Sequence, residues 1–131
     1  MALSWPAVRA GALVALAFTV GTAVVVEVLD ALADLDEGDP VAAVFYLLAM
    51  LGFVVGSYIA GRRAPTSPFV NGWVAMVGVY ALVAIFAMVR RLVGGSDIEP
   101  LALVVNAFGA SLLALLGALI AAGRNAHAGQ P

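Results

Sequence analysis

Four uncharged apolar runs, each about as long as a membrane is thick, constrain this sequence most. They cover residues 10–26, 41–60, 69–89 and 101–122. A hydrocarbon core about 30 Å thick needs about 20 helical residues at about 1.5 Å each. Since hydrocarbon offers no partner to backbone polar groups, segments that cross it are expected to be helices. The sequence therefore predicts an all-α, polytopic membrane four-helix bundle, with a single transmembrane domain over residues 1–131.

The composition agrees with lipid as the main solvent of the chain. Only 11% of the residues are charged and 64% are hydrophobic, whereas soluble domains carry about 25% charged residues. The absence of cysteine excludes disulfides, zinc-thiolate sites and thiol nucleophiles. No basic surface suited to nucleic acid is present. We expect the lipid bilayer as the main partner, with no nucleic acid and no cofactor.

Helix ends are predicted from charge, proline and glycine. The expected helices cover approximately residues 7–29, 41–60, 69–91 and 100–122, with an acidic external loop at 30–40, a basic cytoplasmic loop at 61–68 and a cytoplasmic tail at 123–131. Proline after an acid, as at Pro40 and Pro100, is typical of a helix start. Gly61 and Gly123 are predicted to end the second and fourth helices.

The arginines indicate how the chain is oriented, because cytoplasmic segments of membrane proteins carry an excess of basic residues. With the N-terminus inside, the cytoplasmic arginines are Arg9, Arg62, Arg63 and Arg124, and the external ones are Arg90 and Arg91. We therefore expect cytoplasmic N- and C-termini and a multi-pass protein of the cell membrane. A secretory signal peptide is the alternative for the first run, which is longer than a usual signal core and continues into acidic residues.

Small residues recur at helix-contact spacing in all four runs. The sharpest pair is Gly52 and Gly56, followed by Gly61. Membrane helices lack a hydrophobic drive to associate, so close backbone approach through small residues is how they pack. We interpret these glycines as packing contacts within the chain, with a homo-oligomer interface or a membrane-protein partner as the alternative.

Asn106 is the polar residue of most interest inside the runs. It shares a helical face with Gly109 and Ala110, so it is expected to face the bundle. Its amide is interpreted as a hydrogen bond between helices, and alternatively as a contact to a substrate or ion. No ionisable group lies near mid-membrane, which argues against a proton-coupled pump.

Acidic residues are confined to residues 27–39 and 97–99. Glu27, Asp30, Asp34 and Glu37 fall on one face if the first helix continues beyond the membrane. We predict an external ion-pair network that joins Glu27 and Asp30 to Arg90 and Arg91. A weak external cation site and a solvated face are the alternatives.

Signatures of catalysis are missing. The single histidine, His127, lies in the polar tail, so no triad of serine, histidine and acid and no HExxH zinc site can form within the membrane. There is also no phosphate-binding loop with its lysine. We expect that the chain is not an enzyme.

The junction between the second and third runs carries a distinctive motif. Residues 52–64 read Gly-Phe-Val-Val-Gly-Ser-Tyr-Ile-Ala-Gly-Arg-Arg-Ala, and Asn71-Gly72 follow after a short loop. This resembles a family of small, uncharacterised prokaryotic four-span membrane proteins, whose second helix ends in Gly-Gly-x-x-Ala-Gly-Arg-[Arg/Lys]-Ala and whose third opens with His-Gly. Ser57 and Asn71 depart from that pattern. The resemblance implies a four-helix inner-membrane protein and assigns no activity.

The paired arginines of this motif, Arg62 and Arg63, are predicted to anchor a tight cytoplasmic turn at anionic lipid headgroups. A docking site for a partner is the alternative. For the whole chain, the first hypothesis is a non-enzymatic accessory or structural subunit. The second is a small oligomeric transporter or channel, and a membrane enzyme ranks last.

Overall fold

The computed structural model describes residues 2–33 and 40–128, and over these ranges the chain is all-α. Four helices follow one another: α1 (Trp5–Ala33), α2 (Pro40–Arg63), α3 (Pro68–Val93) and α4 (Pro100–Ala128). Each is long and apolar enough to cross a membrane. The predicted four-helix fold is therefore confirmed, and the chain is a multi-pass membrane protein.

Helix starts follow the predicted chemistry. α2, α3 and α4 each begin at a proline, whose missing N–H has no partner to lose in the first turn and whose φ suits a helix. At the other end of α3, the Gly94 N–H is bonded to the Arg90 carbonyl at 3.0 Å, and Gly95 adopts a left-handed φ of 71°. Glycine at this position lets the chain turn sharply from α3 towards α4.

All four helices run further than predicted, α3 by only one residue at its start and two at its end. α1 continues to Ala33, so Asp30 is helical rather than part of a loop. The prediction that Gly61 and Gly123 end their helices was wrong, because α2 continues to Arg63 and α4 to Ala128. α2 ends two residues before Pro65, which disfavours helix in the residue before it. The last turns of α4 are held by a hydrogen bond at 3.3 Å from the Asn125 amide to the Gly61 carbonyl of α2.

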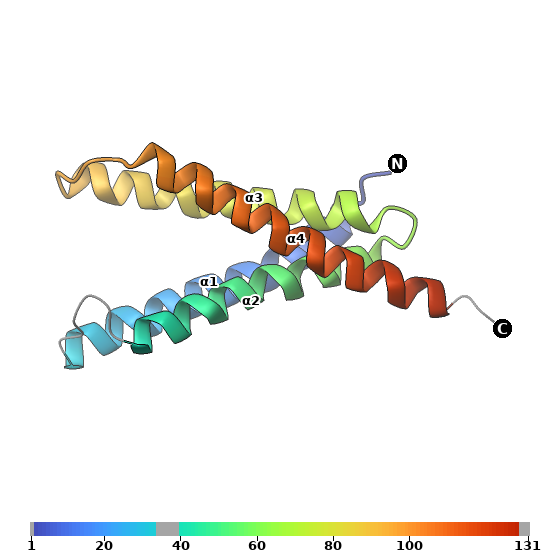
Figure 1. Cartoon of the computed structure of the whole chain (residues 1–131), viewed down its shortest axis with the longest axis horizontal. Helices are drawn as coiled ribbons and strands as arrows, with labels where there is room; N and C mark the ends of the chain where they lie inside the picture. Colours follow the sequence, from blue (N-terminus) through green and yellow to red (C-terminus); the bar gives the residue numbers. More distant parts are fainter. Residues whose placement is uncertain (1, 34–39, 129–131) are drawn as a thin grey trace.

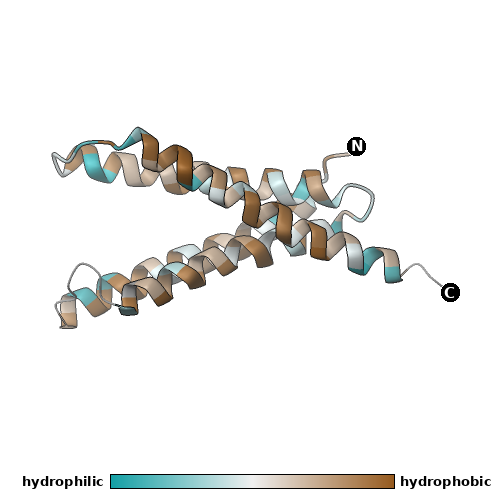
Figure 2. Ribbon diagram, in the orientation of Figure 1, coloured by the Kyte–Doolittle hydropathy of each residue, from teal (hydrophilic) through white to brown (hydrophobic). Residues whose placement is uncertain are grey.

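The helices form two antiparallel hairpins, α1–α2 and α3–α4, that cross at one end and diverge at the other (Figure 1). We call the crossing end the closed end; it carries the chain's N-terminus, the α2–α3 connection at residues 64–67, and the C-terminal end of α4. The diverging end, called the open end, carries the C-terminal end of α1, the start of α2 and the α3–α4 connection at residues 94–99. Polar residues gather towards both ends, and the helices between them are largely apolar (Figure 2).

The core lies in the half of the molecule nearest the closed end. Its buried residues come from the first half of α1, the second half of α2, the first half of α3 and the second half of α4; they include Ala7, Ala15, Phe53, Ala60, Ala75, Met76, Val79, Ala114, Ala118 and Ala121. Most of them are small, so the helix backbones approach closely there. α2 and α3 each pack against the other three helices, whereas the backbones of α1 and α4 do not lie side by side within the described residues.

Buried polar groups reinforce this core. The Ser57 hydroxyl donates a hydrogen bond of 2.5 Å to the Ala114 carbonyl, which joins α2 to α4. Asn71, also fully buried, accepts a hydrogen bond of 2.6 Å from the Ser4 N–H and donates one of 3.1 Å to the Ala2 carbonyl. The amide of Asn71 thus fastens the start of α1 to α3. These bonds satisfy the buried polar groups of both side chains, and those of Asn71 also pair the Ser4 N–H and the Ala2 carbonyl before α1.

Candidate functional site

A cavity of about 610 Å³ lies where the two hairpins diverge. All four helices contribute to its walls, with Thr19, Thr22, Ala23, Val26 and Glu27 of α1, Phe45, Tyr46, Ala49, Met50 and Phe53 of α2, Tyr80 and Val83 of α3, and Val105, Asn106, Gly109, Ala110 and Leu113 of α4. Its volume falls in the range of about 300–1,000 Å³ that is typical of sites for small molecules. The walls are mostly apolar, with a few polar groups.

The floor of the cavity is the packed core. One helical turn from Phe53 towards the closed end lies Ser57, and one turn from Tyr80 lies Met76; both side chains are fully buried. The same step along α1 leads from Thr19 to the buried Ala15. The cavity therefore belongs to the open half of the bundle and stops at this layer.

Most hydroxyl groups in the walls already have a partner. Thr19 and Thr22 donate to the carbonyls of Ala15 and Phe18 in their own helix, at 2.9 and 2.8 Å. The Tyr80 hydroxyl donates to the Leu103 carbonyl at 2.5 Å and so ties α3 to α4. These bonds satisfy the hydroxyl protons and leave the oxygen atoms available as acceptors.

Asn106 differs from these residues. It lies on the cavity wall together with Gly109 and Ala110, as the shared helical face predicts. However, it has no hydrogen bond to any of the described residues, so the expected bond between helices is not formed there. Asn106 is exposed and lies in the half of α4 away from the packed core. The amide keeps two donors and an acceptor for a bound molecule.

An ion pair lies at the edge of the cavity. Glu27 Oε1 of α1 lies 2.6 Å from Arg90 Nη1 of α3, and the Glu27 side chain is 57% exposed. This pair is one of those that the external network predicted. Asp30 makes no ion pair with the described residues, and the predicted stripe positions Asp34 and Glu37 lie outside them.

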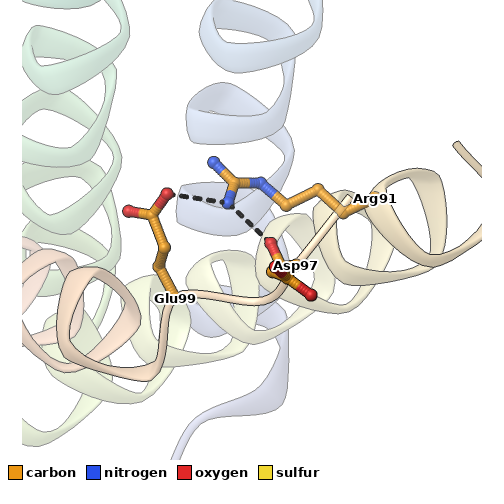
Figure 3. A network of polar contacts seen from close by, with 3 residues as sticks. All are labelled: Arg91, Asp97 and Glu99. Carbon is orange, nitrogen blue, oxygen red and sulfur yellow. Dashed lines mark hydrogen bonds and ion pairs between the residues drawn. The ribbon is translucent and has the colours of Figure 1, made fainter. Parts of the chain in front are cut away.

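Arg91 points elsewhere than predicted (Figure 3). Its Nη1 atom donates to the Asp97 carbonyl at 3.1 Å and lies 3.4 Å from Glu99 Oε1. These contacts close the short connection between α3 and α4. The sequence separation of eight residues around Gly94 and Gly95 was the signal for this pair.

The predicted packing glycines all lie at contacts within the chain. A Cβ atom on Gly52 would collide with Phe18 of α1, and one on Gly56 would lie 2.6 Å from the Gly11 carbonyl oxygen. A Cβ on Gly61 would lie 2.8 Å from Ala121 Cβ of α4. The three glycines of α2 therefore pack against other helices of the same chain.

The arginines of the closed end make few contacts. Arg62 donates to the Asn125 side chain at 3.0 Å, and Arg124 donates to the Tyr58 hydroxyl at 3.0 Å. Arg62, Arg124 and His127 line a shallow hollow at this end. Arg63 is exposed and has no polar partner among the described residues. Headgroup anchoring by Arg62 and Arg63 stays a prediction.

Several residues of the cavity wall follow sequence patterns from which their position could have been predicted. Phe45, Ala49 and Phe53 recur every four residues and so share one face of α2. Tyr80 is a polar aromatic residue inside an apolar run, which is a reason to expect a hydrogen-bond partner. The divergence of the hairpins, which makes these residues the walls of a cavity, had no such signal.

Comparison of the chain with protein-family models, curated proteins and solved structures gives no match. The resemblance at residues 52–64 therefore stays a prediction. Among the described residues, no three histidine, aspartate or glutamate side chains lie close enough to share a metal ion. Any function has to be argued from the cavity and its surroundings.

Proposed function

We propose that this chain is a non-enzymatic accessory protein of a prokaryotic cell membrane that holds an amphipathic guest between its two hairpins. The observation that carries the proposal is the cavity of about 610 Å³ within helices of membrane-spanning length. Its walls combine apolar side chains with an unpaired amide at Asn106, the pattern of sites that bind a mainly apolar molecule and orient it by few polar contacts.

The proposed orientation places the closed end in the cytoplasm. Arg62 and Arg63 end α2 and Arg124 lies near the end of α4, all at the closed end. The acids among the described residues lie towards the open end: Glu27, Asp30, Asp97 and Glu99. Basic residues concentrate on the cytoplasmic side of membrane proteins. The cavity then belongs to the outer half of the bilayer, and a guest would enter it from the outer leaflet or from outside the cell.

Guest binding can be tested at two glycines that both have open space around them, one in the cavity wall and one outside it. A Cβ atom on Gly109, in the cavity wall, or on Gly78, outside it, would have no neighbour within 4 Å. Gly109→Leu should therefore fill part of the cavity without disturbing the fold, and Gly78→Leu should place the same side chain elsewhere on the surface.

The readout is native mass spectrometry of the protein released from mild detergent micelles. Wild type and Gly78→Leu should retain a copurified amphiphile, and Gly109→Leu should lose it. Absence of any retained molecule from wild type would contradict the proposal, as would equal retention by the two variants.

A small transporter is the second candidate, and the closed floor of the cavity favours it. A binding cavity that opens at one end and is closed by a packed layer at the other is one of the two states that alternating access requires. Uptake of the retained amphiphile into liposomes, measured for wild type and for Asn106→Ala, tests this candidate. Uptake equal to that of protein-free liposomes would exclude transport of the amphiphile and leave the accessory role as the function.

A further inference from the structure

We propose that the guest of the cavity is a lipophilic cation, and that Arg90 occupies the place of its charge when the cavity is free. This inference rests on the proposed function, because it names the chemical class that the cavity binds. Charge, aromatic rings and the Glu27–Arg90 ion pair each support it.

The walls favour a positive charge over a negative one. Glu27 is the one charged residue among the described residues that line the cavity. Four aromatic rings accompany it, those of Phe45, Tyr46, Phe53 and Tyr80. The face of an aromatic ring carries partial negative charge and attracts cations. A cation in this cavity therefore meets attraction on several sides, whereas an anion meets none from a basic residue of the wall.

The segments around the cavity mouth add to this preference. Among the described residues, the acids near the open end are Glu27, Asp30, Asp97 and Glu99, and the basic residues are Arg90 and Arg91. Two negative charges remain in excess among these residues. A surface of one sign raises the local concentration of ions of the opposite sign.

Arg90 identifies the group that the guest would replace. Its guanidinium lies 2.6 Å from the Glu27 carboxylate, and the two side chains are 69% and 57% exposed. Ion pairs this exposed contribute little to stability, so they separate easily. A lipophilic cation that enters between the hairpins can thus take over the carboxylate while Arg90 turns to water.

This competition predicts effects of opposite sign. Glu27→Gln removes the attracting charge and should weaken binding of a cation. Arg90→Ala removes the competitor and should strengthen it. If the ion pair only held α1 and α3 together, both variants would loosen the cavity and would weaken binding in the same direction.

The experiment compares tetraphenylphosphonium with tetraphenylborate, which have nearly the same size and shape and opposite charge. Equilibrium dialysis against the purified full chain in neutral detergent, corrected with protein-free micelles, gives the affinity for each ion. Tetraphenylphosphonium should bind at least about tenfold more tightly. The difference should shrink in concentrated salt, because the mouth is exposed to solvent.

Matched variants control for net charge. Arg91→Ala and Glu99→Gln change the charge of the open end as much as the Arg90 and Glu27 variants do, but they alter the α3–α4 connection instead of the cavity (Figure 3). Glu27→Gln should lower affinity for the cation about tenfold, and Arg90→Ala should raise it several-fold. The control variants should change it less than twofold, and circular dichroism verifies that each variant is folded.

Tetraphenylborate binding as tightly as tetraphenylphosphonium would overturn the cation assignment and leave the guest-binding function standing. Weaker cation binding by Arg90→Ala, parallel to Glu27→Gln, would overturn the competition. Saturable binding of neither ion would overturn the assignment as well. If Gly109→Leu and wild type then also retain equal amounts of copurified amphiphile, the proposed function fails with it.

Discussion

Replacing Gly56 by alanine should force α1 and α2 apart in the core of the closed end. A Cβ atom at this position would lie 2.6 Å from the Gly11 carbonyl oxygen, 2.9 Å from Met76 Cε and 3.0 Å from Ala15 Cβ. Met76 can rotate away, but the carbonyl is backbone of α1 and cannot. The helices must therefore separate by several tenths of an ångström along a contact built from small residues.

The size of the effect follows from two opposing contributions. Overpacking of a dense core costs about 1–3 kcal/mol. Alanine in place of glycine within a helix is favourable by about 0.5–1 kcal/mol. Gly78→Ala isolates the second contribution, because a Cβ on Gly78 would have no neighbour within 4 Å. The helix contribution cancels when the two variants are compared, so Gly56→Ala should be less stable than Gly78→Ala by about 1–3 kcal/mol.

Unfolding in mixed micelles, with increasing sodium dodecyl sulfate in a mild detergent and circular dichroism as the signal, measures this difference. Fluorescence of the two tryptophans, Trp5 of α1 and Trp73 of α3, gives an independent signal. Gly78→Ala should unfold at or above the wild-type midpoint, and Gly56→Ala should unfold clearly below it. Identical midpoints for the two variants would refute the close approach of α1 and α2 at Gly56.

Three further predictions concern polar residues and orientation. Ser57→Ala should lower the free energy of unfolding by about 0.6 kcal/mol and by no more than ~1.7 kcal/mol. The loss is small because the Ala114 carbonyl keeps the N–H donor of its own helix. A larger loss in the mixed-micelle assay would show that the hydroxyl has another role. Asn71→Ala should lower it by about 1–3 kcal/mol and make the segment before α1 sensitive to protease, and unchanged protease resistance would mean that the amide does not fasten this segment. Because the chain lacks cysteine, a single cysteine introduced at Thr66 or Ser96 can report orientation. An impermeant maleimide should label Ser96→Cys on intact cells and Thr66→Cys only after permeabilisation. The reverse pattern of labelling would invert the proposed topology.

The number and length of the helices could be predicted because hydrocarbon thickness and backbone polarity leave no other structure for four such runs. The helix ends were less predictable. Gly61 has the local sequence of a helix end, yet it is buried against Ala121 of α4, and this tertiary contact decides its role. The local sequence contains the glycine and the arginine of a helix end, but it carries no information about the helix that packs on them.

For the candidate site, the helical face of Asn106 could be predicted, but its environment could not. Periodicity places this residue beside Gly109 and Ala110, whichever element faces them. Whether that face meets another helix or a cavity depends on the angle between the hairpins, and the angle depends on contacts many residues away. The pair of Glu27 and Arg90 was easier to predict, because both lie near helix ends on the same side of the membrane.

The cavity and the tight core have one origin, the uneven distribution of residue size along each helix. Ala15 and Gly56 lie in the halves of α1 and α2 nearest the closed end, and Ala75 and Gly117 lie in the corresponding halves of α3 and α4. Four antiparallel helices bring these halves to the same end, where the backbones can approach closely.

The opposite halves line the cavity with larger side chains, among them Phe45 and Tyr46 of α2 and Val105 of α4. The hairpins diverge there from the small-residue core (Figure 1). Any closure of the cavity on a guest must then occur by bending about that core, whose packing resists change at every contact. The stability of the closed end and the affinity of the cavity are therefore coupled, and a variant that spreads the core, such as Gly56→Ala, should weaken guest binding without touching the cavity wall.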